Sequence, residues 1–209
     1  MLIFMRMNND TCLIEIPALL NNKVSKILSF RAENLIIEKP LSLMPPDFIP
    51  AETITGFRYG VSWINGFTFT IGRQYFIEVQ NDQQKVIHIK LPSYYGIRKK
   101  LYGQIWSDII YQLWHSYFIN QYNYYYELYN INQTFELCGI QFHFYGISWH
   151  VQNILLWDEV AISSYRTYFM IYNSKNKMQY KSRDFARDWN AVVLQALLKR
   201  IVDERKVLQ

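Results

Sequence analysis

Apolar residues recur at nearly every second position through much of the first half of the chain, which is the period of a β-strand. The runs "KVSKILSF" (23–30) and "NLIIEK" (34–39) flank "RAE" and predict a first hairpin. Residues 40–52 hold four of the six prolines and are predicted to form a loop or the margin of a sheet. Residues 1–22 show no clear period and are expected to form an N-terminal arm.

Two further hairpins are predicted before residue 92. Asn65 and Gly66 lie between two alternating runs, and this pair accepts the positive φ angles of a type I′ turn. Further along, "QYFIEVQ" (74–80) and "KVIHIKL" (85–91) flank the polar tip "NDQQ". The first half of the chain therefore predicts an antiparallel sheet connected by hairpins.

The period then changes from 2 to 3.6, which predicts a long helix. From Arg98 to Phe118 the apolar residues follow one helix face, and "NQYNYYYELYN" (120–130) continues the register, with a bend or a break expected at its polar residues. Most of its five tyrosines are predicted to pack, in preference to forming a platform for a flat ligand. Tyr124 lies off the stripe and is expected to be exposed. The stripe consists of Trp114, Phe118, Tyr122, Tyr125 and Tyr129.

The β pattern returns after residue 133 and gives way to a second helix. Strands are predicted over 134–149, 153–162, 166–173 and 177–182, with a polar turn "NSKN" before the last. The final helix is predicted from about Asp184, with Ser182 or Asp184 as its N-cap. Its apolar stripe consists of Phe185, Trp189, Val193, Leu197 and Ile201.

The order of strands followed by a helix thus occurs twice, which indicates two copies of one plan. "QYFIEVQNDQQKVIHIK" and "TYFMIYNSKNKMQYKS" each combine an aromatic strand, a polar tip and a second strand before a helix. The predicted organisation is an arm (1–22), a first unit that includes the long aromatic helix (23–130) and a second unit (131–209).

This α+β plan resembles the bacterial PH-like domain, here as two units in tandem. The resemblance is strongest in the second unit, where "LWDEV" (156–160) leads into a second sheet and Asn190 opens the closing helix. It implies that each unit is a bent antiparallel sheet closed by a C-terminal helix. Phosphoinositide-binding PH domains carry several cations in and around the first hairpin, whereas the corresponding loops here hold Arg31 alone and none. The resemblance therefore implies the fold and argues against classical phosphoinositide recognition.

Motifs that support catalysis are missing from the sequence. There is no G-x-S-x-G nucleophile motif and no cluster of glycines that would cradle a phosphate. Asp158 and Glu159 are adjacent on a predicted strand, so their side chains are expected on opposite faces. Cys138, His143 and His150 would need a break in their strand to share a metal ion. We expect a protein that is not an enzyme and uses no cofactor or metal.

Composition predicts a folded protein with a slight basic excess. Half of the 209 residues are apolar, and 17 tyrosines, 13 phenylalanines and six tryptophans give it an aromatic core. Two cysteines are too few for a disulfide framework, and no run approaches the ~20 apolar residues that span a bilayer. The sequence thus predicts no transmembrane segment and a cytoplasmic location. The net charge of +5 permits an acidic partner.

Two basic clusters precede the predicted helices, where the positive end of a helix dipole attracts anions. They are alternatively solvated surface charges. The candidate contacts with an anion or partner are Arg98, Lys99, Lys100, Lys181, Arg183, Arg187 and the exposed Tyr124.

Two functions compete at this point. The first is a non-catalytic interaction module, of the adaptor, scaffold or cognate-inhibitor type, that binds a protein partner through sheet edges or helix grooves. The alternative is peripheral binding of anionic lipid or nucleic acid through the basic helix starts and exposed aromatic residues.

Overall fold

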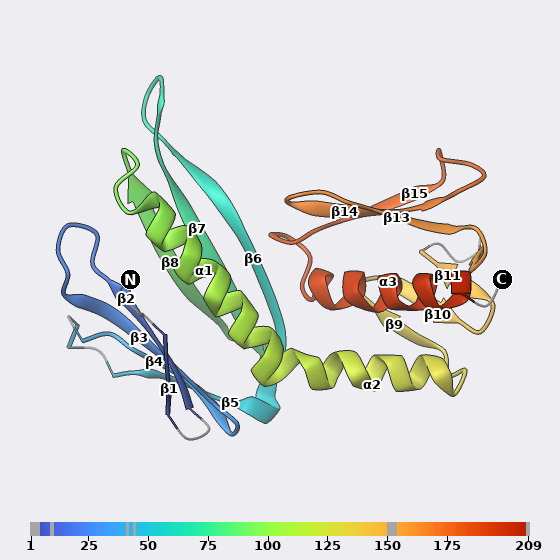
Figure 1. Cartoon of the computed structure of the whole chain (residues 1–209), viewed down its shortest axis with the longest axis horizontal. Helices are drawn as coiled ribbons and strands as arrows, with labels where there is room; N and C mark the ends of the chain where they lie inside the picture. The colour runs from blue at the N-terminus through green and yellow to red at the C-terminus, as the bar shows by residue number, and fades with distance from the viewer. Residues whose placement is uncertain (1–4, 9–10, 41, 44, 150–153, 208–209) are drawn as a thin grey trace. The chain divides into compact units, whose positions relative to one another are not determined.

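The computed structural model describes residues 5–8, 11–40, 42–43, 45–149 and 154–207 (Figure 1). The chain divides into two compact units, Met1–Phe118 and Ile119–Gln209. Each unit combines helix with two antiparallel sheets, so the predicted α+β class is confirmed. Among the described residues, no helix has the length and apolar character needed to cross a membrane.

The first sheet of unit 1 has five strands in sequential order: β1 (Met5–Asn8), β2 (Thr11–Pro17), β3 (Val24–Arg31), β4 (Asn34–Glu38) and β5 (Asp47–Pro50). The β3–β4 hairpin is confirmed, and the proline-rich segment supplies the marginal strand β5, followed by a 3₁₀ turn (Ala51–Thr53). The arm expected over 1–22 is corrected, because β2 pairs with β3 and buries Ile14 and Ile16.

The second sheet of unit 1 has three strands, β6 (Ile54–Asn65), β7 (Thr70–Asn81) and β8 (Val86–Tyr94). The two predicted hairpins share β7 as one continuous strand. The predicted type I′ turn is wrong, since neither Asn65 nor Gly66 has a positive φ. A four-residue loop connects the strands instead, and the Gly66 amide donates to the Phe69 carbonyl at 2.8 Å.

Helix α1 (Lys99–Leu113) covers the sheets of unit 1 and contacts β2, β7 and β8. It buries Tyr102, Ile105, Ile109 and Leu113, which lie on the apolar helix face predicted between Arg98 and Phe118. A π-helical segment (Trp114–Phe118) and α2 (Ile119–Asn130) follow, so the irregular stretch precedes the polar residues at which a bend was expected. Because α2 packs on α3, the compact units divide after Phe118, whereas the sequence placed the division after Asn130.

Unit 2 also has two sheets. The first has the order β12-β11-β10-β9 and consists of β9 (Phe135–Leu137), β10 (Ile140–His143), β11 (Gly146–Ser148) and β12 (Ile154–Leu156). The second consists of β13 (Val160–Ser164), β14 (Tyr168–Asn173) and β15 (Tyr180–Asp184). The single strand predicted over 134–149 is wrong, because positive φ angles at Cys138 and Gly139 turn the chain between β9 and β10.

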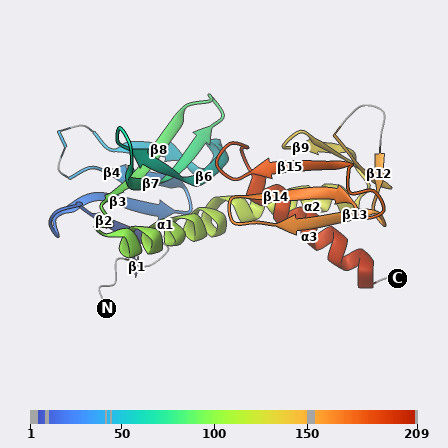
Figure 2. The same cartoon turned by 90° about the horizontal axis from the view of Figure 1, so that it is seen from above.

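Helix α3 (Ala191–Val207) contacts β13 and runs beside the second sheet (Figures 1 and 2). The predicted start at Asp184 is wrong, because Asp184 caps a separate turn in which its carboxylate accepts from the Ala186 amide at 2.8 Å. Asn190, with φ at +58°, directly precedes the helix. Val193, Leu197 and Ile201 of the predicted stripe are fully buried on α3, whereas its first two members, Phe185 and Trp189, precede the helix.

The order of elements repeats along the chain. In each unit a sequentially connected antiparallel sheet precedes a three-stranded sheet, and a helix follows, α1 in unit 1 and α3 in unit 2. The sequence match between "QYFIEVQNDQQKVIHIK" and "TYFMIYNSKNKMQYKS" falls on the corresponding hairpins, β7–β8 and β14–β15.

Candidate functional site

Three connections meet at one end of unit 1. They are the β2–β3 turn (18–23), the β6–β7 hairpin end (62–73) and the segment from β8 into α1 (95–100), which we call together the loop end. The Tyr95 amide donates to the Ile71 carbonyl at 2.8 Å and joins the second connection to the third. In Figure 1 the β6–β7 hairpin end and the start of α1 are both at the upper left of the molecule.

Arg98 joins the third connection to the first. Its Nε donates to the Leu19 carbonyl at 2.9 Å, and its Nη2 donates to the Asn21 carbonyl at 2.8 Å and to Asn22 Oδ1 at 3.0 Å. Its backbone is left-handed, with φ at +56°, where α1 begins. Arg98 was predicted to contact an anion, and the structure uses its guanidinium to hold the turn beside the helix.

Lys99 and Lys100 are exposed in the first turn of α1. This is the positive end of the helix dipole, which adds to the attraction for an anion. With Lys23, Arg73 and Arg98, they give the loop end five cations, and its three segments contain no Asp or Glu. The chain has 22 Lys and Arg against 17 Asp and Glu, so these five residues account for the whole basic excess.

The loop end also exposes large apolar side chains. Phe67 is completely exposed at the hairpin tip, and Trp63 is 61% exposed with the Arg73 guanidinium 4.8 Å from its ring centroid. These residues were not predicted as functional from the sequence, because an alternating pattern beside a tight turn is typical of half-buried strands. The full set is Leu20, Trp63, Phe67, Phe69, Tyr95 and Ile97.

The second basic cluster does not form a comparable surface. Arg183 Nε donates to the Cys138 carbonyl at 2.7 Å and so supports the turn between β9 and β10. Lys181 is half-buried on β15, and Arg187 lies in the turn before α3 between Asp184 and Asp188. In this cluster, the charge of Arg183 therefore supports a turn, and Arg187 is flanked by acidic residues in the sequence.

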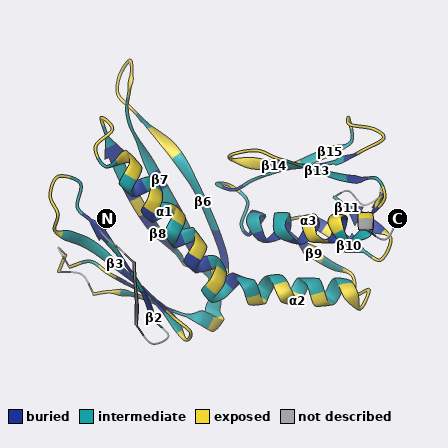
Figure 3. Cartoon of the chain, in the orientation of Figure 1, coloured by how far each residue is buried: buried dark blue, intermediate teal, exposed yellow. Residues whose placement is uncertain are grey.

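Tyrosines of α2 contact polar and charged side chains of α3 through their hydroxyl groups and rings. Tyr126 donates to the Glu204 carboxylate at 2.8 Å, and the Arg200 guanidinium lies 3.6 Å from the Tyr126 ring centroid. Arg205 Nε donates to the Tyr129 hydroxyl at 2.6 Å. No residue of α2 is fully buried (Figure 3), so the helix is less deeply packed than the stripe predicted. Tyr124 is 57% exposed, as expected.

Tyr124 and Tyr125 provide a test of this register. Tyr125 is half-buried and packs 5.3 Å from the Phe135 ring centroid, whereas Tyr124 faces outward. We expect Tyr125→Ala to lower the free energy of unfolding by about 2 kcal/mol and Tyr124→Ala by less than about 0.5 kcal/mol. Urea denaturation of both variants measures the difference, and equal losses would show that the helix faces are assigned incorrectly.

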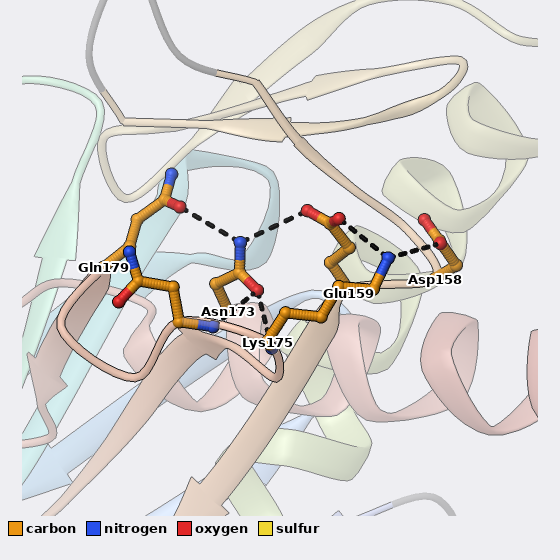
Figure 4. A network of polar contacts seen from close by, with 6 residues as sticks. Asp158, Glu159, Asn173, Lys175 and Gln179 are labelled. Atoms are coloured by element: carbon orange, nitrogen blue, oxygen red, sulfur yellow. Dashed lines mark hydrogen bonds and ion pairs between the residues drawn. The ribbon is translucent and has the colours of Figure 1, made fainter.

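The adjacent carboxylates Asp158 and Glu159 converge, contrary to the prediction that they face opposite ways. They lie in the turn between β12 and β13, and Lys175 Nζ is 3.0 Å from Glu159 and 3.6 Å from Asp158 (Figure 4). Asn173 Nδ2 donates to Glu159 Oε2 at 3.2 Å and to Gln179 Oε1 at 3.1 Å. The hydrogen bond that Lys175 donates to Glu159 is the main cause that raises the pKa of Lys175. This network ties the turn to the β14–β15 loop.

Cys138 and His143, two of the three residues considered for a metal ion, have protein partners. The Cys138 thiol donates to the Trp189 carbonyl at 2.9 Å, and burial raises the pKa of this thiol to about 12. His143 Nε2 lies 3.1 Å from Ser148 Oγ, and His150 lies outside the described residues. Within the part of the chain that the structure describes, no group of three or more Cys, His, Asp and Glu side chains is arranged to hold a metal ion.

Unit 2 contains an open cavity of about 610 Å³ between α2, α3 and the β12–β13 turn. Its lining mixes Asp158, Glu204 and Arg205 with aromatic rings. The Arg205 guanidinium lies 5.4 Å from the Trp157 ring centroid and 5.7 Å from the Tyr129 ring centroid. These two aromatic rings of the cavity wall therefore already contact a cation of the protein itself. The cavity lacks the single sign of charge that distinguishes the loop end.

Comparisons of the chain with protein-family models, with curated proteins and with solved structures found no match. The function is therefore inferred from the geometry of the loop end.

Proposed function

We propose that this chain is a non-catalytic binding protein of two PH-like units, and that unit 1 binds an acidic surface through the loop end. Each unit has two consecutive antiparallel sheets followed by a helix, which supports the PH-like interpretation. In unit 2, "LWDEV" forms the passage from the first sheet to the second, and Asn190 directly precedes α3, as the resemblance implies.

The observation that carries the proposal is the segregation of charge. Five cations and no carboxylate lie on three connections that hydrogen bonds hold together, while the charges of the rest of the chain sum to zero. Elsewhere in unit 1, Arg58 pairs with Glu78 at 2.6 Å and Lys39 pairs with Asp47 at 2.7 Å. A cluster of unmatched like charges costs self-repulsion, which an anionic partner removes on binding.

Arg98 contributes by positioning. Its hydrogen bonds to residues 19–22 keep the β2–β3 turn, and with it Lys23, beside the first turn of α1. Lys99 and Lys100 remain exposed in that turn. The loop end is therefore a broad positive surface. It is better suited to a partner that carries many negative charges than to one small anion.

Reversing the two exposed lysines tests this function. We expect K99E/K100E to weaken binding to immobilised heparin at least about 30-fold at low salt, because each lysine near an anionic surface contributes about 1 kcal/mol. The matched control is K177E/K199E, which makes the same change in net charge at exposed lysines of unit 2. Surface plasmon resonance at two salt concentrations measures both variants. Equal losses in the two variants would show that only net charge matters and would remove the loop end from the proposal.

A further inference from the structure

We infer that the acidic surface is an anionic lipid bilayer, into which the tip of the β6–β7 hairpin inserts Phe67 and Phe69. This inference rests on the proposed function and names its partner. It follows from the combination, at one end of unit 1, of five cations with apolar side chains that the described residues of the unit leave exposed.

The hairpin tip projects beyond the sheet. The last row shared by three strands pairs Ile64, Gly72 and Tyr94, so residues 65–71 extend past the end of β8. Figure 1 shows this tip reaching beyond the start of α1. Phe67 and Phe69 lie on this convex extension, where they reach into an opposing surface without requiring it to be shaped as a pocket.

Trp63 and Arg73 lie one row below, directly across from each other on β6 and β7. The contact of the guanidinium with the indole ring pairs an amphipathic ring with a cation. Tryptophan prefers the boundary between headgroups and acyl chains, and arginine binds lipid phosphates. The order along the hairpin, with phenylalanine at the tip and the Trp–Arg pair behind it, matches the order of layers in a bilayer.

The aliphatic members of the exposed set decide between a bilayer and a nucleic acid. Leu20 and Ile97 have no aromatic face on which a base stacks, yet they are exposed beside the same cations. A bilayer accepts aliphatic and aromatic side chains equally, while its anionic headgroups attract Lys23, Lys99 and Lys100. Apolar insertion and charge attraction together provide the two weak signals that stable peripheral binding requires.

Vesicle flotation with the full chain tests the inference. We expect binding to vesicles of phosphatidylcholine with phosphatidylserine and much weaker binding to phosphatidylcholine alone. F67S/F69S should weaken binding to the anionic vesicles about 100-fold, as the loss of two inserted phenyl groups predicts. It should leave the affinity for heparin within about 3-fold, because no charge changes. The matched control is F48S/F144S, which replaces two exposed phenylalanines outside the loop end and should bind like the wild type.

Brominated lipids provide a second measurement. They should quench part of the tryptophan fluorescence in the wild type, and W63F should abolish that quenching while retaining the unfolding midpoint. Heparin binding without vesicle binding would overturn the bilayer and leave the proposed function standing, with an acidic protein or a nucleic acid as the partner. Unchanged vesicle binding by F67S/F69S would overturn insertion. If the chain bound neither heparin nor anionic vesicles, the proposed function would be overturned as well.

Discussion

Trp157→Ala should lower the free energy of unfolding of unit 2 by about 3–5 kcal/mol. The side chain is only 4% exposed and lies in the turn that connects the two sheets of the unit. Its ring contacts Tyr129 of α2 edge-on, with centroids 5.5 Å apart, and Phe142 of β10 at 6.0 Å. Its Nε1 donates to the His143 carbonyl at 3.2 Å. Truncation would remove these contacts together with the hydrogen bond to the His143 carbonyl.

The matched control for this variant is Trp63→Ala at the loop end. Trp63 is mostly exposed, so we expect a change in unfolding free energy of less than about 1 kcal/mol. The affinity of Trp63→Ala for anionic vesicles should fall. The vesicle binding of Trp157→Ala should decrease only in proportion to the fraction of protein that is unfolded. Urea denaturation monitored by circular dichroism gives the two free energies. If the two tryptophan variants were equally unstable, the assignment of Trp157 to the core and Trp63 to the surface would be incorrect.

Hydrophobic periodicity correctly predicted the helices and strands that bury one face and expose the other. The apolar faces were predicted correctly for α1, which buries Ile105 and Ile109, and for the part of the second stripe that lies on α3, which buries Leu197 and Ile201. The strands of β7–β8 and β14–β15 were correct because polar tips separate them. In each case the sequence pattern that predicts the element lies within that element or directly beside it.

Predictions failed where a single backbone conformation decides the outcome. The turn at Cys138 and Gly139 divides a run of alternating residues that reads as one strand, and only Gly139 hinted at it. Asp184 has the chemistry of an N-cap but caps a separate turn, and the helix begins after the left-handed Asn190. Residues 11–17 alternate clearly between half-buried and buried, but the β2 run was too short to stand out from the unpatterned residues before it.

The candidate site was predicted in part. Lys99 and Lys100 are exposed at the start of α1, as the basic cluster indicated, but Arg98 beside them is used to hold a turn that lies far earlier in the sequence. The chain order gives no sign that residues 18–23 and 62–73 join this cluster. The segregation of all the excess charge to one end therefore became visible only when the three connections were placed together.

The architecture of the loop end depends on a close approach at Gly72. A Cβ atom at this position would overlap the Ser93 carbonyl oxygen and lie 3.0 Å from the Tyr94 Cα. Both atoms belong to the backbone of β8, so no side-chain rotation relieves the contact. The neighbouring Ile71 carbonyl accepts the Tyr95 amide that links the hairpin to the start of α1. The absence of a side chain at residue 72 thus allows the third connection to reach the second.

Gly72→Ala should therefore cost about 3 kcal/mol of unfolding free energy, through separation of β7 from β8. It should also weaken binding to anionic vesicles, although it changes no charged or exposed apolar side chain. Gly66→Ala is the matched control, because its Cβ would meet a side-chain methyl of Ile71 at 3.2 Å and the loop can adjust, with a cost of less than about 1 kcal/mol. Denaturation and flotation of both variants provide the comparison. If Gly72→Ala kept full stability and full vesicle binding, the spacing of the three connections would be irrelevant, and binding would depend on charge and exposed apolar area alone.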